Sequence, residues 1–157
     1  MIAEIDLPGF ARDLQAQSHE LSKQLGAALR DFGATIVHKA GENLLALDPP
    51  ATVLICEGLF RFRCEGKMAR LYGPGDMLQT GQREGLGHCD LVSPFAARIT
   101  VFERRALARG LAASPELVEK WLELQAIDER ILQVVAAARA REDIQPEFDS
   151  QLREAGM

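Results

Sequence analysis

His88 and Cys89 are adjacent in the sequence and are the side chains best suited to metal or redox chemistry. Imidazole and thiolate groups both bind haem iron or transition metals, and a thiol is also a redox centre. The side chains of neighbouring residues in an extended strand point to opposite faces of the sheet. His88 and Cys89 can therefore bind the same metal ion only if a turn at Gly87 breaks this alternation. We therefore expect a loop histidine beside a half-buried cysteine. A haem or thiol-redox sensor using His88, Cys89 or Cys64 is the alternative.

The three cysteines, Cys56, Cys64 and Cys89, form an odd set without a Cys-X-X-Cys pair. This pattern fits reduced thiols in the cytosol. If Glu57 and Gly58 form a two-residue turn, Cys56 and Cys64 are not opposite each other, and we expect no disulfide between them. The pattern does not decide whether any of the three thiols is redox-active.

The histidines offer no metal-dependent enzymatic site. His19, His38 and His88 are far apart, whereas an enzymatic β-barrel of the cupin type needs two closely spaced histidines, a carboxylate and a later histidine. No Ser-His-Asp or Cys-His arrangement and no phosphate-binding loop stands out. We therefore expect no enzymatic activity, no metal and no cofactor.

The charge balance argues against nucleic acid and membranes as partners. The 157 residues carry 18 basic and 23 acidic side chains, a net charge of -5, so long-range steering to polyanions is not favoured. The acidic start "MIAEIDLPGF" does not resemble a signal peptide, and no apolar run has the length of a membrane span. These features predict a cytoplasmic protein without membrane contact, and the net charge disfavours direct nucleic-acid binding.

The elements that position these residues follow from the hydrophobic spacing. Apolar residues at helical intervals predict a helix over 10–32, ended by Gly33. From Ala34 the chain breaks into short runs separated by turn signals, which is typical of a compact antiparallel β structure. In "LFRFRC" the alternation places Phe60, Phe62 and Cys64 on the core face. On the solvated face of this hairpin we expect Arg61, Arg63 and Arg70.

A second long helix is predicted after Ser114-Pro115-Glu116, where a serine cap, a proline and an acid come in the order that begins helices. Apolar residues then follow a heptad spacing over about three heptads. Either this stripe packs on the β structure of its own chain, with Trp121 as anchor, or two copies pair into a parallel homodimer. We favour the homodimer, since packing on a sheet needs no heptad period. Its predicted interface consists of Leu117, Leu124, Ile127, Ile131, Val134 and Ala138.

Three segments, "KAGENLLALD", "VLICEGLFRFRCEGKMARLYGPGD" and "ITVFERRALARGLAASPELVEKW", carry a family resemblance. Their glycine frame resembles the cyclic nucleotide-binding-like domains of the catabolite activator and fumarate-nitrate regulators (the Crp/Fnr-like regulators). The resemblance covers roughly residues 30–140 and implies an α+β, mainly β fold: an antiparallel β-roll or jelly roll between an N-terminal helix and a long C-terminal helix. The expected segments are an N-terminal helical part (1–33), the β-roll sensor core (34–110), the dimerisation helix (111–143) and a polar tail (144–157).

In that family, an arginine-led motif after the "GD" strand holds a cyclic phosphate. Here Leu86-Gly87-His88 stand where that motif is expected, and Arg83 is the nearest guanidinium. A buried phosphate without a charge partner is costly, so we expect no tight binding of cyclic AMP or cyclic GMP. The alternative is an atypical phosphate loop in which a register shift brings Arg83 into the site. The candidate ligand-binding residues are Arg83, Leu86, Gly87 and His88.

The output of the regulators is a helix-turn-helix domain after the long helix. The residues that follow Ala138 are polar, acidic and too few for such a domain. Family members with an iron–sulfur cluster carry N-terminal cysteines, and here no cysteine precedes Cys56. We expect a non-enzymatic, dimeric sensor module that acts through an unknown small ligand or a protein partner. Whether the chain is full-length or truncated before a DNA-binding domain is left open.

Overall fold

The computed structural model describes the backbone of residues 9–154 and the side-chain environment of 12–138 and of residue 140. Residues 1–8, which include most of the acidic start, and residues 155–157 of the predicted tail lie outside the described residues.

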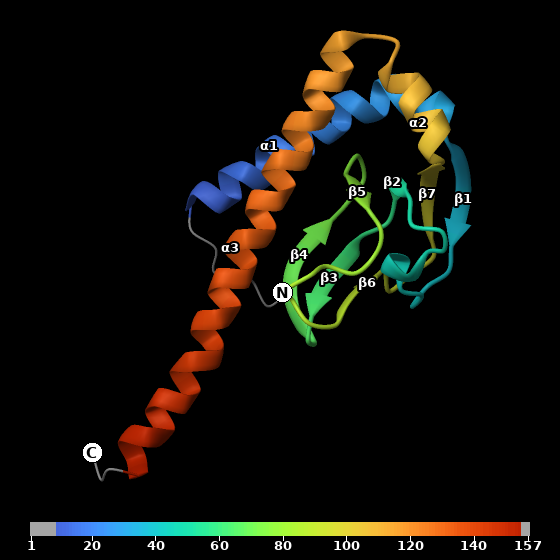
Figure 1. Cartoon of the computed structure of the whole chain (residues 1–157). Helices are drawn as coiled ribbons and strands as arrows, with labels where there is room; N and C mark the ends of the chain where they lie inside the picture. Colours follow the sequence, from blue (N-terminus) through green and yellow to red (C-terminus); the bar gives the residue numbers. More distant parts are fainter. Residues whose placement is uncertain (1–8, 155–157) are drawn as a thin grey trace.

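Figure 1 shows a β-roll flanked by α1 and a long α3, which cross each other. The helices are α1 (Gly9–Leu29), α2 (Arg104–Leu111) and α3 (Pro115–Glu154), with 3-10 turns at Arg30–Phe32 and Leu44–Ala46. The strands are β1 (Ala34–His38), β2 (Thr52–Glu57), β3 (Phe60–Cys64), β4 (Lys67–Tyr72), β5 (Met77–Gln79), β6 (Cys89–Val92) and β7 (Ala97–Phe102).

The strands form two antiparallel sheets, one ordered β1-β7-β2-β5 and the other β4-β3-β6. The inward faces of both sheets supply a shared apolar core, because side chains alternate along each strand. Phe60, Phe62 and Cys64 are buried as the alternation predicted, at 0%, 2% and 0% exposure. The predicted antiparallel β-roll with an N-terminal helix and a long C-terminal helix is therefore confirmed.

The glycine-led corners turn the chain from one sheet to the other. Gly58 has a φ of +121° and Gly75 a φ of +92°, backbone values that side chains with a Cβ rarely adopt. Glu57-Gly58 is not a two-residue hairpin turn, since β2 pairs with β5 and β7 whereas β3 pairs with β4 and β6. Cys56 and Cys64 therefore lie in different sheets.

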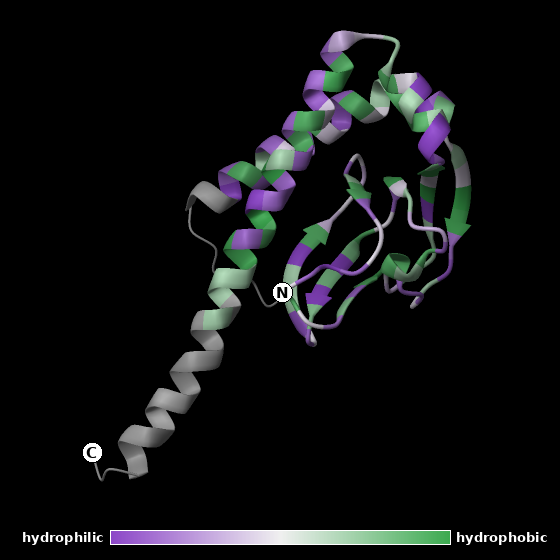
Figure 2. Cartoon of the chain, viewed as in Figure 1, coloured by the Kyte–Doolittle hydropathy of each residue, from purple (hydrophilic) through white to green (hydrophobic). Residues whose placement is uncertain are grey.

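Helix α1 packs against α3 along a face of small and apolar residues. Ser18 and Ser22 are completely buried, and their small side chains allow the two helices to approach closely. Leu25 and Leu29 of α1 belong to the same buried cluster as Leu124 of α3. Figure 2 shows hydrophobic residues recurring among hydrophilic ones along both helices.

The predicted dimer stripe is largely a core face of the chain itself. Leu124, Ile127 and Ile131 are 1%, 6% and 1% exposed, because they pack against α1 and the β-roll. Val135, which the heptad did not include, is 3% exposed and continues the same face. The remaining predicted positions, Leu117, Val134 and Ala138, are half-buried. The alternative of packing on the chain's own β structure therefore describes Leu124, Ile127 and Ile131, which are buried within the single chain.

Strand β4 departs from simple alternation. A bulge shifts the β3–β4 register between Phe62 and Arg63, so that Phe62 lies opposite Arg70. One extra residue in a strand turns the following side chain to the other face. The prediction that Arg70 lies on a solvated face with Arg61 and Arg63 is therefore wrong, since Arg70 is 7% exposed.

The long helix also exceeds its predicted boundary. It runs to Glu154 instead of ending at residue 143, and it includes Pro146. A proline removes one backbone donor and kinks a helix, but it does not require the helix to end. Among the described residues, no helix combines the length and apolarity needed to cross a membrane.

Candidate ligand cavity between the β-roll and the long helix

A cavity of about 300 Å³ separates α3 from the side of the β-roll formed by β2, β4 and β5. Its volume lies at the lower end of the range typical of small-molecule sites. The walls combine apolar side chains with a few polar and charged groups. The lining residues are Thr52, Tyr72, Met77, Leu78, Gln79, Arg83, Trp121, Leu124, Gln125, Asp128, Glu129 and Leu132.

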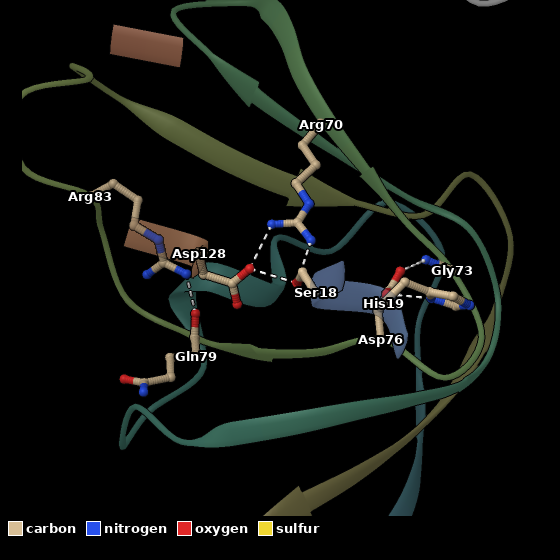
Figure 3. Close-up of polar contacts among 8 residues, drawn as sticks. All are labelled: Ser18, His19, Arg70, Gly73, Asp76, Gln79, Arg83 and Asp128. Carbon is tan, nitrogen blue, oxygen red and sulfur yellow. Dashed lines mark hydrogen bonds and ion pairs between the residues drawn. The ribbon is translucent and has the colours of Figure 1, made fainter. Parts of the chain in front are cut away.

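Arg83 reaches this cavity from the loop between β5 and β6. One of its guanidinium nitrogens donates to the carbonyl of Gly81 at 2.9 Å. Another donates to the carbonyl of Gln79 (Figure 3). These carbonyls hold the guanidinium at the rim. The structure thus places Arg83 at the cavity, which the alternative of an atypical loop required, but two of its donors are already engaged.

The other three candidate ligand residues lie elsewhere. Leu86 is 5% exposed and belongs to the core of the roll. Gly87 and His88 are exposed, and the backbone N–H of His88 donates to the carboxylate of Glu65 at 2.6 Å. The loop therefore turns away from the cavity after Arg83. The four candidates do not form one site.

A buried ionic network reaches the cavity through Asp128, which is its member in the cavity lining. Arg70 donates to Asp128 Oδ1 at 3.0 Å and to the hydroxyl of Ser18 at 3.0 Å, and Ser18 donates to the same carboxylate oxygen at 2.7 Å (Figure 3). Side-chain exposure is 6% for Arg70 and 24% for Asp128. A buried guanidinium needs such partners, because its desolvation is otherwise uncompensated. The network joins α1, β4 and α3.

Tyr72 lies between this network and the cavity. The Arg70 guanidinium carbon is 4.4 Å from the centre of the Tyr72 ring, a cation–π contact. Burial raises the pKa of Tyr72 above its ordinary value, although the positive charge of Arg70 opposes the change. Burial also works against the charged form of Arg70, but the interactions with Tyr72 and Asp128 outweigh it and raise the pKa of Arg70. Arg70 is therefore charged and the Tyr72 hydroxyl neutral at physiological pH.

A second contact ties α1 to the Gly-Pro-Gly-Asp turn. The Asp76 carboxylate accepts from the backbone N–H of Gly73 at 2.8 Å and lies 2.7 Å from Nδ1 of His19 (Figure 3). His19 has this partner although its side chain is 46% exposed. The turn-forming "GD" was the available signal that Asp76 has a structural role.

The cavity chemistry does not suit a phosphate. Its charged groups are the single guanidinium of Arg83 and the carboxylates of Asp128 and Glu129. A phosphate site needs unengaged guanidinium and amide donors, and carboxylates repel the anion. The arrangement instead favours an uncharged or cationic molecule with an apolar part against Trp121, Leu124 and Leu132.

The His88–Cys89 pair does not form a joint metal site. Cys89 is 0% exposed, whereas His88, which precedes β6, is exposed. Cys89 is fully buried and not half-buried as expected. Within the described part of the chain, no three His, Cys, Asp or Glu side chains are grouped so that they could hold a metal ion.

Comparisons with known proteins identify the fold. The reduced CO-sensing protein from R. rubrum is similar with a TM-score of 0.55 and 17% identity, over 76% of this chain and 56% of that chain. Oxidized CprK in complex with o-chlorophenolacetic acid is similar with a TM-score of 0.55 and 11% identity, over 80% of this chain and 53% of that chain. The heme domain of CooA from Carboxydothermus hydrogenoformans is similar with a TM-score of 0.56 and 11% identity, over 82% of this chain and 94% of that chain. No protein-family model and no curated protein matches the sequence.

These likenesses confirm the cyclic nucleotide-binding-like fold that the glycine frame predicted. At these identities they show the fold alone. The chain spans little more than half of the CO-sensing protein and of CprK, but nearly all of the CooA heme domain.

Proposed function

We propose that this chain is a non-enzymatic regulatory sensor module that binds a small molecule between its β-roll and α3. The observation that carries the proposal is the cavity wall formed by Asp128. This residue faces the cavity from α3 and is bonded to Arg70 of β4 and Ser18 of α1. A molecule that contacts Asp128 changes the connection between the roll and both helices, and this connection is the output of the sensor.

The ligand we propose is small, uncharged or cationic, with a flat apolar part. The apolar wall supplies its affinity, and Asp128, Glu129 and the Gln79–Gln125 pair supply polar partners. Cyclic nucleotides are not expected, because the two carboxylates oppose their phosphate. The solved neighbours are consistent with this class of function, since one is a CO-sensing protein and another is in complex with o-chlorophenolacetic acid.

We further propose that the module is a cytoplasmic homodimer whose contact uses the uncovered face of α3. Val118 is 39% and Leu122 is 61% exposed, on a different side of the helix from the buried Leu124 and Ile131. Two apolar side chains one helical turn apart are suited to pairing with the same helix of a second copy. This face differs from the heptad stripe, of which Leu124, Ile127 and Ile131 are buried in the single chain.

Trp121 makes the ligand proposal directly measurable. It is the only tryptophan of the chain and lines the cavity, so a ligand in the cavity changes its fluorescence. We would titrate the protein with cyclic AMP, cyclic GMP, ATP, haem and a panel of small aromatic amines and amides, and follow fluorescence and the melting temperature. A compound at about 100 times its Kd stabilises the fold by about 2.7 kcal/mol, which shifts the melting midpoint visibly.

A matched pair of variants localises the binding. Leu132→Phe fills the cavity and should abolish binding, whereas Gln133→Phe, at the next and exposed position, should leave it unchanged. Loss of binding in both variants, or in neither, would place the ligand elsewhere. Stabilisation by cyclic AMP that Arg83→Gln removes would show that the phosphate loop is functional after all. A Soret band in the purified protein would favour the haem alternative.

A further inference from the structure

Cys64 and Cys89 lie directly opposite each other on the neighbouring strands β3 and β6. Their sulfur atoms are 3.1 Å apart, and both residues are 0% exposed. The next pair along the ladder, Glu65 and His88, is joined by a backbone hydrogen bond of 2.8 Å. Since hydrogen-bonded and non-hydrogen-bonded pairs alternate, Cys64 and Cys89 form a non-hydrogen-bonded pair.

This kind of pair has the backbone spacing that a disulfide needs. Cα atoms of a non-hydrogen-bonded antiparallel pair are about 4.5 Å apart, and disulfides span Cα separations of about 4.4–6.8 Å. Both side chains also point to the same face of the sheet, so a rotation about χ1 brings the sulfur atoms to bonding distance. Cys56 lies in the other sheet, where its sulfur is hydrogen-bonded to the hydroxyl of Thr100 at 3.2 Å.

We propose that Cys64 and Cys89 are a redox modification site that forms a reversible disulfide with a low-molecular-weight disulfide as the oxidant. The thiolate of one cysteine attacks the small disulfide, forms a mixed disulfide and expels one small thiolate. The second cysteine, as its thiolate, attacks the protein sulfur of that mixed disulfide and expels the second small thiolate. The two protons lost by the cysteines protonate the two expelled thiolates, and the small disulfide is reduced while the pair is oxidised.

The surroundings of Cys89 provide a route for the oxidant. Cys89 is the first residue of β6, which is the edge strand of its sheet. The loop before it contains Gly81, Gly85 and Gly87, all with positive φ. Edge strands next to such loops open locally at a lower free energy than the whole fold. Opening the first residue of β6 therefore exposes both sulfur atoms without global unfolding.

The pair is also connected to the ligand loop. The side-chain amide of Gln82 donates to the carbonyl of Cys89 at 3.0 Å, and its oxygen accepts from the Cys89 N–H at 3.1 Å. Arg83, the next residue, lines the cavity. Oxidation shortens the sulfur separation to about 2.05 Å, and Gln82 transmits the movement of Cys89 to Arg83. This coupling rests on the proposed ligand cavity, whereas the disulfide itself does not.

The chemistry is tested by refolding the full chain from urea in a series of reduced and oxidised glutathione mixtures, so that burial does not limit the rate. After an acid quench and alkylation, trypsin separates the three cysteines onto peptides 40–61, 64–67 and 84–98. We expect peptide 64–67 linked to peptide 84–98, with the loss of two hydrogen atoms, and Cys56 alkylated. The same link should form in the folded protein, more slowly, and dithiothreitol should reverse it.

The matched variants separate this pair from general thiol oxidation. Cys56→Ala should keep the link and its melting temperature should rise by several degrees on oxidation, while Cys89→Ala should show neither effect. The proposal would be overturned if disulfides to Cys56 formed as often as the Cys64–Cys89 link. It would also be overturned by stable glutathione adducts on Cys64 or Cys89, or by the alkylation of all three cysteines in excess oxidised glutathione. If the disulfide forms but oxidised and reduced Cys56→Ala bind a Trp121-quenching ligand equally, only the coupling to the cavity is wrong.

Discussion

The carboxylate of Asp128 on α3 lies 3.0 Å from the guanidinium of Arg70 on β4, across 58 positions of sequence. Ser18 of α1 completes the contact, so one carboxylate oxygen joins three elements. We expect Asp128→Ala to lower the free energy of unfolding by about 2 to 3 kcal/mol, because the buried charge of Arg70 is left without its partner. Urea denaturation measures the change.

The neighbouring Glu129→Ala is the control for this prediction. Glu129 is also at the cavity but is exposed, and we expect a change within about 0.5 kcal/mol. The double variant Arg70→Met with Asp128→Leu should recover most of the lost stability, since an apolar pair of similar volume can replace a buried ion pair. Equal destabilisation by Asp128→Ala and Glu129→Ala would show that the network does not hold the helix.

The burial of Tyr72 leads us to expect that the free energy of unfolding falls at alkaline pH. Burial raises its pKa in the folded state, so the folded protein holds the phenolic proton more tightly than the unfolded chain. Its contribution is fully present below the unfolded pKa of about 10 and is lost as the pH rises towards the folded pKa. Tyr72 is the only tyrosine, so the ultraviolet absorbance of tyrosinate reports its titration alone.

The comparison with Tyr72→Phe isolates this effect from the lysines that titrate in the same range. The slope of unfolding free energy against pH above about 10 should be smaller in the variant than in the parent chain. A tyrosinate midpoint in the folded protein at or below that of the urea-unfolded chain would contradict the prediction.

The fold was predictable because it rests on local signals. The glycine corners, the Phe60–Phe62–Cys64 alternation and the cap at Ser114 each depend on residues close in sequence. Arg70 was mispredicted because a bulge is a property of two paired strands and not of β4 alone. The Cys64–Cys89 contact was missed for a related reason, since the pairing of β3 with β6 spans 25 residues and includes a loop whose path the sequence does not determine.

In the candidate site, too, features set by residues close in sequence could be predicted, whereas contacts between distant segments could not. Arg83 was named from the sequence as the nearest guanidinium, and its route into the cavity depends on the loop from Gly81 to His88. Trp121 was considered as an anchor of α3, and it does pack with the apolar cluster around Leu25. Asp128 carried no signal, because an acidic residue between apolar positions of a helix is usually solvated. Its partner was the mispredicted Arg70, so neither residue pointed to the other.

The dimer proposal distinguishes two faces of α3. We expect the double variant Val118→Glu with Leu122→Glu to be folded and monomeric, because both side chains are exposed in the single chain. Ile131→Glu should instead lower the unfolding free energy by more than about 3 kcal/mol, since it buries a charge in the core. Light scattering coupled to gel filtration gives the mass, and circular dichroism the folding. A double variant that stays dimeric would exclude this face.

Gly58 is expected to be less replaceable than Gly66, another glycine with positive φ. A Cβ at this position would lie 2.6 Å from Ala97 Cβ, and its φ is +121°. Gly66 has a φ of +76°, but a Cβ added there would meet no atom within 4 Å, so Gly66→Ala carries only the backbone cost of about 1 kcal/mol. Gly58→Ala adds a clash between two sheets that a rotamer change does not relieve, and we expect a loss of about 3 kcal/mol or more. Urea denaturation of the two variants side by side tests this, and equal losses would mean that the β2–β3 corner can move away from Ala97.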